Sequence, residues 1–151
     1  MPMRKLIVGI VCLMVSAFAM AQGTVAGAES KPFKGNFLNR EYDVYICLDP
    51  YQKNVIVPGQ EIYGELPGYL GDNKDGRKWL FTSSAIKNAT TLRLEVINDY
   101  GSEDLTATLE QTDDTTFVLR QGAGSTLKIA RNRKWVRLPK RLTFYKQNDR
   151  Q

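Results

Sequence analysis

Apolar and polar residues alternate along several short stretches of the chain between Phe33 and Lys146. Side chains of a strand point to opposite faces in turn, so a period of two is typical of a strand with one buried face. β-Branched and aromatic residues, which strands prefer, are frequent in these stretches. We therefore predict half-buried strands over residues 42–48, 92–97, 105–110, 117–120, 127–129 and 142–144.

Turn-forming residues separate these stretches at short intervals. They cluster at Asp49-Pro50, Asp72–Gly76, Lys87–Ala89, Asn98–Gly101, Thr112–Asp114 and Gly122–Gly124. No stretch after residue 21 has a sustained helical period. The predicted fold class is all-β, an antiparallel meander of eight to ten short strands that closes into a barrel, with a β-sandwich as the alternative. The irregular stretch Val57–Gly76 is expected at one mouth of the barrel, where it could cover the opening.

The first 21 residues have the three parts of a secretory signal peptide. Arg4 and Lys5 form a basic head, the apolar run Leu6–Phe18 follows, and Ala19–Ala21 supplies the cleavage site. The run is shorter than the about 20 apolar residues of a membrane-spanning helix. We expect cleavage after Ala21 and a periplasmic or secreted protein without a transmembrane span, with an uncleaved anchor as the alternative. The predicted organisation is a signal peptide 1–21, a flexible leader 22–32, a single β-barrel domain 33–146 and a disordered tail 147–151.

The chain contains no histidine, and cleavage of the signal peptide leaves Cys47 as its one cysteine. This composition excludes a Ser-His-Asp triad, a Cys-His pair and an internal disulfide, and it removes the commonest zinc ligand. We predict no enzyme activity, no cofactor and no metal site. Lys74 interrupts the oxygen-ligand spacing that a calcium loop at Asp72–Gly76 would need. Cys47 is interpreted as a half-buried thiol, with a dimer bridge or a reactive group as alternatives. An enzyme would need paired carboxylates, for which the candidates are Glu61, Glu65, Asp99, Glu103 and Asp104.

Aromatic residues are the main candidates for ligand contact. Trp79 shares a strand face with Phe81, where it either fills the core or lines a cavity, because both outcomes occur in eight-stranded barrels. Tyr63, Tyr69 and Tyr100 lie in or beside predicted loops, so we expect them to be exposed. The predicted ligand-binding residues are therefore Tyr63, Tyr69, Trp79 and Tyr100.

A basic stretch lies near the C-terminus and includes Trp135. Such a stretch can hold phosphate, sulfate or sugar-acid groups through charge-assisted hydrogen bonds. The alternative is a solvated strand edge, where Lys and Arg discourage pairing with other chains. Loss of Arg4 and Lys5 with the signal peptide lowers the formal net charge from +5 to +3, which does not favour a dedicated polyanion binder. The predicted anion-binding residues are Arg131, Arg133, Lys134 and Arg137.

A signal peptide, a domain of this length and a series of hairpins from Phe33 to Tyr145 occur together here. In these features the chain resembles the small secreted lipocalin-like β-barrel proteins of Gram-negative bacteria, particularly those of the Bacteroidetes. Lipocalins carry Gly-x-Trp in the first strand and a Thr-Asp-Tyr turn. This chain has Gly35-Asn36-Phe37 and Asn98-Asp99-Tyr100 at the matching places. The resemblance implies a lipocalin-like barrel that carries a ligand, and it identifies no ligand-binding residue.

Two classes of function remain. The first is a non-enzymatic extracytoplasmic binding protein for a small apolar ligand or an anionic envelope component, a glycan or lipid. A ligand inside the barrel requires an open apolar cavity beside inward positions such as Val44, Ile46, Leu94 and Leu105. The alternative is a periplasmic or secreted protein-interaction module, such as an inhibitor or immunity protein. It predicts a filled interior and an exposed patch of Tyr, Trp and Arg. Nucleic acid is not an expected partner in either case.

Overall fold

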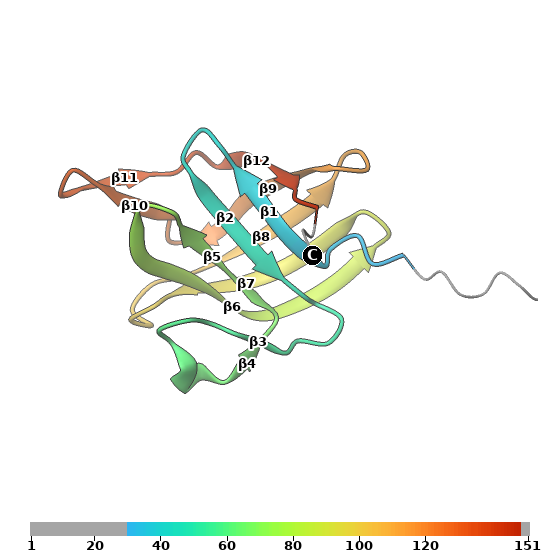
Figure 1. Cartoon of the computed structure of the whole chain (residues 1–151), viewed down its shortest axis with the longest axis horizontal. Coiled ribbons are helices and arrows are strands. Elements are labelled where there is room, and N and C mark those ends of the chain that lie inside the picture. Colours follow the sequence, from blue (N-terminus) through green and yellow to red (C-terminus); the bar gives the residue numbers. More distant parts are fainter. Residues whose placement is uncertain (1–29, 149–151) are drawn as a thin grey trace, which may run out of the picture. The chain divides into compact units, whose positions relative to one another are not determined.

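Eight antiparallel strands form a closed barrel in the computed structural model, which describes residues 30–148 (Figure 1). Around the barrel the strands follow the order β1-β12-β9-β8-β7-β6-β5-β2. Apart from the closing pair β1–β12, each strand lies beside the barrel strand that precedes or follows it, so the topology is a meander. The barrel strands are β1 (Gly35–Asn39), β2 (Val44–Leu48), β5 (Gly68–Asp72), β6 (Asp75–Asn88), β7 (Thr91–Asn98), β8 (Asp104–Gln111), β9 (Thr116–Gly124) and β12 (Arg141–Lys146). The predicted all-β barrel is confirmed, and its closure excludes the β-sandwich.

The alternation of the sequence sets the two faces of the wall. On β7, Leu92, Leu94 and Val96 are buried while Arg93 and Glu95 between them are exposed. The register between β7 and β8 places the inward side chains of the two strands opposite one another. A shift by one residue would turn all of them toward water, so burial of one face fixes this register.

Side chains fill the interior of the barrel. Phe117 contacts Phe37 edge to face with ring centroids 4.7 Å apart, and Phe33, which precedes β1, contacts the same ring at 5.9 Å. The four inward positions at which the sequence predicted a cavity, Val44, Ile46, Leu94 and Leu105, are only 0–3% exposed. These side chains are therefore closely packed, and the pocket that reaches Leu105 is an open one that the exposed Thr82 and Glu95 also line. A ligand site among the described residues therefore has to be sought on the outside.

A first inserted hairpin covers the outer face of β5 and β6. It consists of β3 (Val55–Ile56) and β4 (Glu65–Leu66), with the 3-10 helix η2 (Glu61–Tyr63) between them. Its apolar side chains pack on the wall in a second cluster that contains Val57, Leu66, Tyr69 and Leu80. The expectation that the stretch Val57–Gly76 covers the barrel mouth is therefore wrong: its first half packs on the outer wall, and its second half forms part of the barrel.

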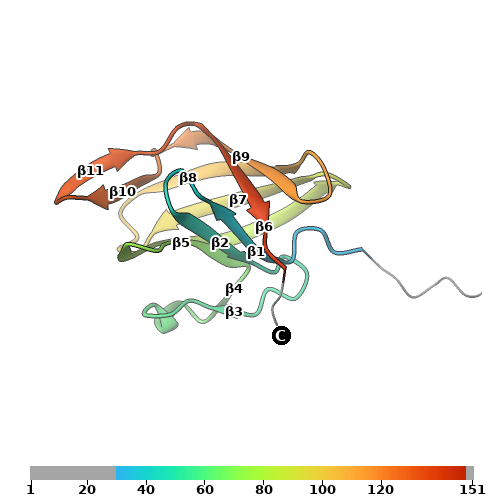
Figure 2. The same cartoon turned by 45° about the horizontal axis from the view of Figure 1, so that its top comes forward.

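A second inserted hairpin, β10 (Lys128–Arg131) and β11 (Lys134–Arg137), lies between β9 and β12 in the sequence, although these two strands pair in the barrel (Figure 2). Ile129 and the flanking Leu127 and Leu138 join the main core. Arg131 ties the hairpin to the end of β5, because its guanidinium forms a two-pronged ion pair with Asp72 at 2.6 and 2.8 Å. The hairpin is thus fixed to the barrel by apolar packing and by a charged contact.

The described residues start at Ser30 and end at Asn148. The predicted signal peptide and most of the leader and tail lie outside the described residues, and the compact unit begins at Lys31. The Gln147 N–H donates to the carbonyl of Asn36, which extends the pairing of β12 with β1 by one residue. Within residues 30–148, no helix has the length and apolar character needed to cross a membrane.

Candidate functional site

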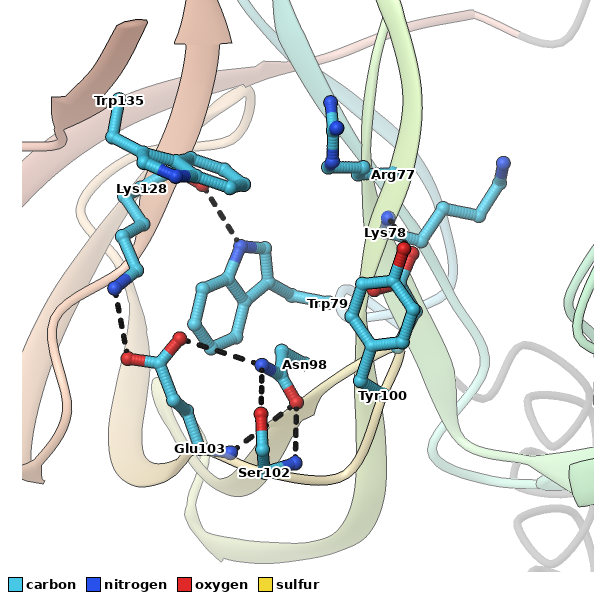
Figure 3. A pocket seen from close by; sticks show the side chains of 10 residues that line it. Arg77, Lys78, Trp79, Asn98, Tyr100, Ser102, Glu103, Lys128 and Trp135 are labelled. Carbon is cyan, nitrogen blue, oxygen red and sulfur yellow. Dashed lines mark hydrogen bonds and ion pairs between the residues drawn. The ribbon is translucent and has the colours of Figure 1, made fainter.

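A pocket of about 260 Å³ opens where the start of β6, the β7–β8 turn and the β10–β11 hairpin meet (Figure 3). Figure 3 shows Trp135 and Tyr100 on opposite sides of this aromatic pocket, with Trp79 between them. The pocket is lined by Arg77, Lys78, Trp79, Asn98, Asp99, Tyr100, Ser102, Glu103, Lys128 and Trp135.

Asn98 organises the β7–β8 turn that forms one side of the pocket. Its Oδ1 accepts hydrogen bonds from the N–H groups of Ser102 at 2.9 Å and Glu103 at 3.2 Å. Its Nδ2 donates to the Ser102 hydroxyl at 3.0 Å and to Glu103 Oε2 at 3.3 Å. Gly101 has a φ of +73°, a left-handed conformation that glycine adopts without strain. The turn is therefore held in one shape, with Tyr100 at its tip and 80% exposed.

Lys128 joins the turn to the inserted hairpin. Its ammonium lies 2.9 Å from Glu103 Oε1, and both side chains are 30% exposed. Its carbonyl accepts a hydrogen bond of 3.1 Å from the indole N–H of Trp79. Trp79 is 6% exposed and belongs to the main core, so the base of the pocket is continuous with the interior of the barrel. The polar groups around the opening are thus held in place by the fold.

Trp135 is the more exposed of the two tryptophans. It is 58% exposed on β11, and the Arg77 guanidinium and Lys128 ammonium lie 5.1 and 5.8 Å from its centre. Cations at this distance are attracted to the face of an indole. Trp135 therefore combines an exposed aromatic surface with two neighbouring positive charges.

The predicted aromatic residues have different positions. Trp79 and Tyr100 both line the pocket. Tyr63 belongs to η2, and its hydroxyl lies 3.6 Å from where a Cβ on Gly101 would be, beside the tip of the turn. The prediction that Tyr69 is exposed is wrong. Tyr69 is 7% exposed on β5 under the first inserted hairpin, where burial raises the pKa of its hydroxyl well above the usual range.

The four predicted anion-binding residues also lie in different places. Arg133 and Lys134 line a second pocket beside the first. Arg131 does not, because it pairs with Asp72 and donates to the Tyr42 carbonyl at 2.7 Å, and the bond to Asp72 raises the pKa of the guanidinium. Arg131 is therefore a structural residue, and its prediction as a ligand group is wrong. Arg137 is exposed on β11 and lines neither of these two pockets.

Sequence reasoning missed five residues of the pocket: Arg77, Lys78, Asn98, Ser102 and Lys128. Asn98 stood in a predicted turn, and the Asn-x-x-x-Ser-Glu spacing that lets it bridge two backbone N–H groups was the available signal. For Lys128 the sequence offers no such signal, because Glu103 is 25 positions away and the two meet only after the hairpin docks on the barrel.

Two of the candidate carboxylates, Asp99 and Glu103, share the pocket. Both oxygens of Glu103 are in use, one by Lys128 and one by Asn98, while Asp99 accepts the N–H of Lys78 at 3.2 Å. No group of three or more His, Cys, Asp or Glu side chains within residues 30–148 is placed to hold a metal ion. Cys47 is half-buried beneath the first inserted hairpin, and burial raises the pKa of its thiol.

The pocket combines exposed aromatic rings with hydrogen-bonding groups whose positions are fixed by the turn and the hairpin. Such an arrangement can hold a ligand that has both an apolar face and several hydroxyl or acidic groups. Comparisons of this chain with protein-family models, with curated proteins and with solved structures find no match.

Proposed function

We propose that this protein is a non-enzymatic, extracytoplasmic binding protein that holds a sugar unit of an envelope glycan in the aromatic pocket. The observation that carries the proposal is the position of Trp135 and Tyr100, 58% and 80% exposed, on the two sides of a pocket with fixed polar groups. A pyranose ring has C–H faces that pack on aromatic rings and hydroxyls that both donate and accept hydrogen bonds.

The polar groups of the pocket suit such a ligand. Ser102 can donate and accept, Asp99 accepts, and Arg77 and Lys78 donate. Because the Asn98 network and the Glu103–Lys128 ion pair hold the surrounding backbone in place, little conformational entropy is lost on binding. The filled interior argues against a small apolar ligand carried inside the barrel, so the outer pocket is the better place for a ligand.

Binding is favoured over hydrolysis by the state of the carboxylates. A glycosidase needs one carboxyl group that donates a proton to the leaving oxygen. Glu103 is held as an ion pair with Lys128 at 2.9 Å. Its second oxygen accepts from Asn98 at 3.3 Å, so neither oxygen is presented free to a substrate.

The test is isothermal titration of the purified protein with a panel of neutral and acidic oligosaccharides. Trp135→Ala should weaken binding at least about tenfold, equivalent to about 1.4 kcal/mol. Tyr145→Ala, which removes a ring that is 49% exposed on β12, is the matched control and should leave the affinity unchanged. The proposal is overturned if no oligosaccharide binds, if Trp135→Ala binds normally, or if the bound oligosaccharide is cleaved.

A protein-interaction module is the second candidate, and one observation favours it. Ile62, the central residue of η2, is 90% exposed, and Tyr63 beside it approaches the tip of the β7–β8 turn near Tyr100. Tyrosine, tryptophan and arginine are enriched among the residues that dominate protein interfaces. Under this candidate, Ile62→Ser with Tyr63→Ser abolishes cross-linking of the protein to a partner in an envelope extract, while sugar titrations show no binding.

A further inference from the structure

A second pocket, which we call the basic pocket, adjoins the aromatic pocket and shares Arg77 and Trp135 with it. It has a volume of about 460 Å³ and lies between the β5–β6 turn and the tip of the β10–β11 hairpin. These two segments are more than 50 positions apart in the sequence. Lys74 and Asp75 from the turn and Asn132, Arg133 and Lys134 from the hairpin also line it.

Positive charge dominates this lining. Asp75 is its single acidic residue, and the Arg77 guanidinium lies 2.7 Å from the Asp75 carboxylate. A hydrogen bond from the Arg77 N–H, together with that guanidinium, keeps the pKa of Asp75 below its usual value. Lys74, Arg133 and Lys134 form no ion pair with any residue of the described range 30–148. Three cations therefore surround one opening without an acidic partner.

The fold places these three cations around one opening. Arg131, the last residue of β10 before the two-residue loop, fastens the tip end of the hairpin to Asp72, which immediately precedes the β5–β6 turn. The same contact therefore keeps the turn that carries Lys74 beside the hairpin that carries Lys134. An anion in this pocket would therefore meet positive charges that structural contacts have already gathered.

The backbone at the hairpin tip gives a further reason. Asn132 and Arg133 have φ values of +52° and +65°, so both central residues of this two-residue loop are left-handed. Asparagine tolerates this conformation at the first position, and glycine is the preferred residue at the second. Arginine at the second position is strained, so the stability of the turn does not explain its presence. What Arg133 adds is a guanidinium, which can bind two oxygens of a carboxylate, sulfate or phosphate at once.

We propose that the basic pocket is an anion subsite that binds the acidic group of a glycan whose adjoining sugar ring lies in the aromatic pocket. The inference rests on the proposed function, and it narrows the ligand class from glycans in general to acidic glycans. Arg133 supplies a forked contact to the anion, and Lys74 and Lys134 add charge on either side. Arg77 and Trp135 at the boundary of the two pockets would contact both parts of the ligand.

The experiment compares three probes of equal length by isothermal titration of the full-length mature protein. They are a neutral cello-oligosaccharide, an oligogalacturonate with carboxylates and a heparin oligosaccharide with sulfates. The test variant is Arg133→Gly with Lys134→Ser, because glycine suits the left-handed position and keeps the turn. Arg137→Ser is the control, since it removes a cation from the same strand but outside both pockets. Circular dichroism should show that both variants are folded.

We expect the wild type to bind at least one acidic probe more than tenfold more tightly than the neutral one. This preference should weaken between 50 and about 300 mM salt, because screening reduces it. The double variant should lose at least tenfold in affinity for the acidic probe while Arg137→Ser stays within about twofold. The ratio of the two acidic affinities then identifies the preferred anion. Equal binding of neutral and acidic probes, or an unchanged double variant, overturns the subsite and leaves the sugar site standing.

A second measurement separates failure of the subsite from failure of the proposed function. Inorganic sulfate is titrated into ¹⁵N-labelled protein, and amide shifts are followed by nuclear magnetic resonance. Saturable shifts at Lys74, Arg133 and Lys134 that disappear in the double variant support an anion site even if no sugar binds. Absence of saturable shifts together with equal binding of all sugars overturns the subsite alone.

Discussion

The Arg131–Asp72 ion pair can be tested by replacing Arg131 with methionine, which keeps much of the apolar length of the side chain and removes its charge. In the wild type the guanidinium donates four hydrogen bonds: two to Asp72, one to the Tyr42 carbonyl and one to the Ala130 carbonyl. Arg131→Met leaves the Asp72 carboxylate, whose side chain is 4% exposed, without its cation.

The expected loss follows from that burial. Removing one partner of a buried ion pair costs about 3–5 kcal/mol, because the remaining charge is left uncompensated. The Arg131 side chain is 21% exposed, so water reaches the gap and the lower end of the range applies. We expect Arg131→Met to lower the free energy of unfolding by about 3 kcal/mol, and the melting temperature of this domain by about 12 °C.

Urea unfolding followed by circular dichroism measures the loss. Arg120→Met is the matched control, because Arg120 lies 3.7 Å from Glu110 with both side chains nearly half exposed; such a pair contributes less than about 1 kcal/mol. Adding Asp72→Asn to Arg131→Met should recover part of the loss, since it removes the unpaired charge. A loss below about 1 kcal/mol, or a loss equal to that of Arg120→Met, would refute the structural role assigned to Arg131.

Two further predictions concern stability. Burial raises the pKa of the Tyr69 hydroxyl, so the folded protein keeps a proton that the unfolded chain loses from about pH 10, and stability should fall above that pH by about 1.4 kcal/mol per unit. Tyr69→Phe should flatten this fall in urea titrations between pH 9.5 and 11, and equal slopes in the variant and the wild type would contradict the prediction. A Cβ on Gly124, where φ is +110°, would collide with the Asp104 carbonyl oxygen, so Gly124→Ala should cost at least about 2 kcal/mol. Gly76→Ala, with open space around the new methyl group, should stay within about 0.5 kcal/mol in the same urea assay.

Strand positions could be predicted where one face of the strand is buried and the other is exposed to solvent. β7 is the clearest example, because Leu92, Leu94 and Val96 mark the inner face without help from any distant residue. The predicted turn at Gly122–Gly124 is wrong, since β9 continues to Gly124. There the glycines serve close packing: a Cβ on Gly122 would lie 2.6 Å from Thr106 Oγ1 on β8. Turn composition alone does not separate a turn from such a crowded strand end.

The candidate site could be predicted only in part, because many of its contacts join residues that are far apart in the sequence. Trp79 and Tyr100 were identified from the side chain itself and its place beside a turn. Tyr69 was misassigned because the hairpin that covers it docks on the outer wall through contacts distant in sequence. Arg131 was misassigned for the same reason, since its partner Asp72 is 59 positions away. A basic residue in a sequence shows its charge but not whether the fold has already paired it.

The two tryptophans of the chain differ tenfold in exposure, with Trp79 at 6% and Trp135 at 58%. Indole fluorescence shifts to longer wavelength as the ring becomes more exposed to water, so the native emission is a sum of two bands from two depths. The shorter-wavelength band reports the packing of the barrel, and the longer-wavelength band reports events at the pocket opening. The fluorescence of the protein therefore reports separately on the barrel interior, through Trp79, and on the pocket opening, through Trp135. The variant Trp135→Phe leaves the Trp79 signal alone.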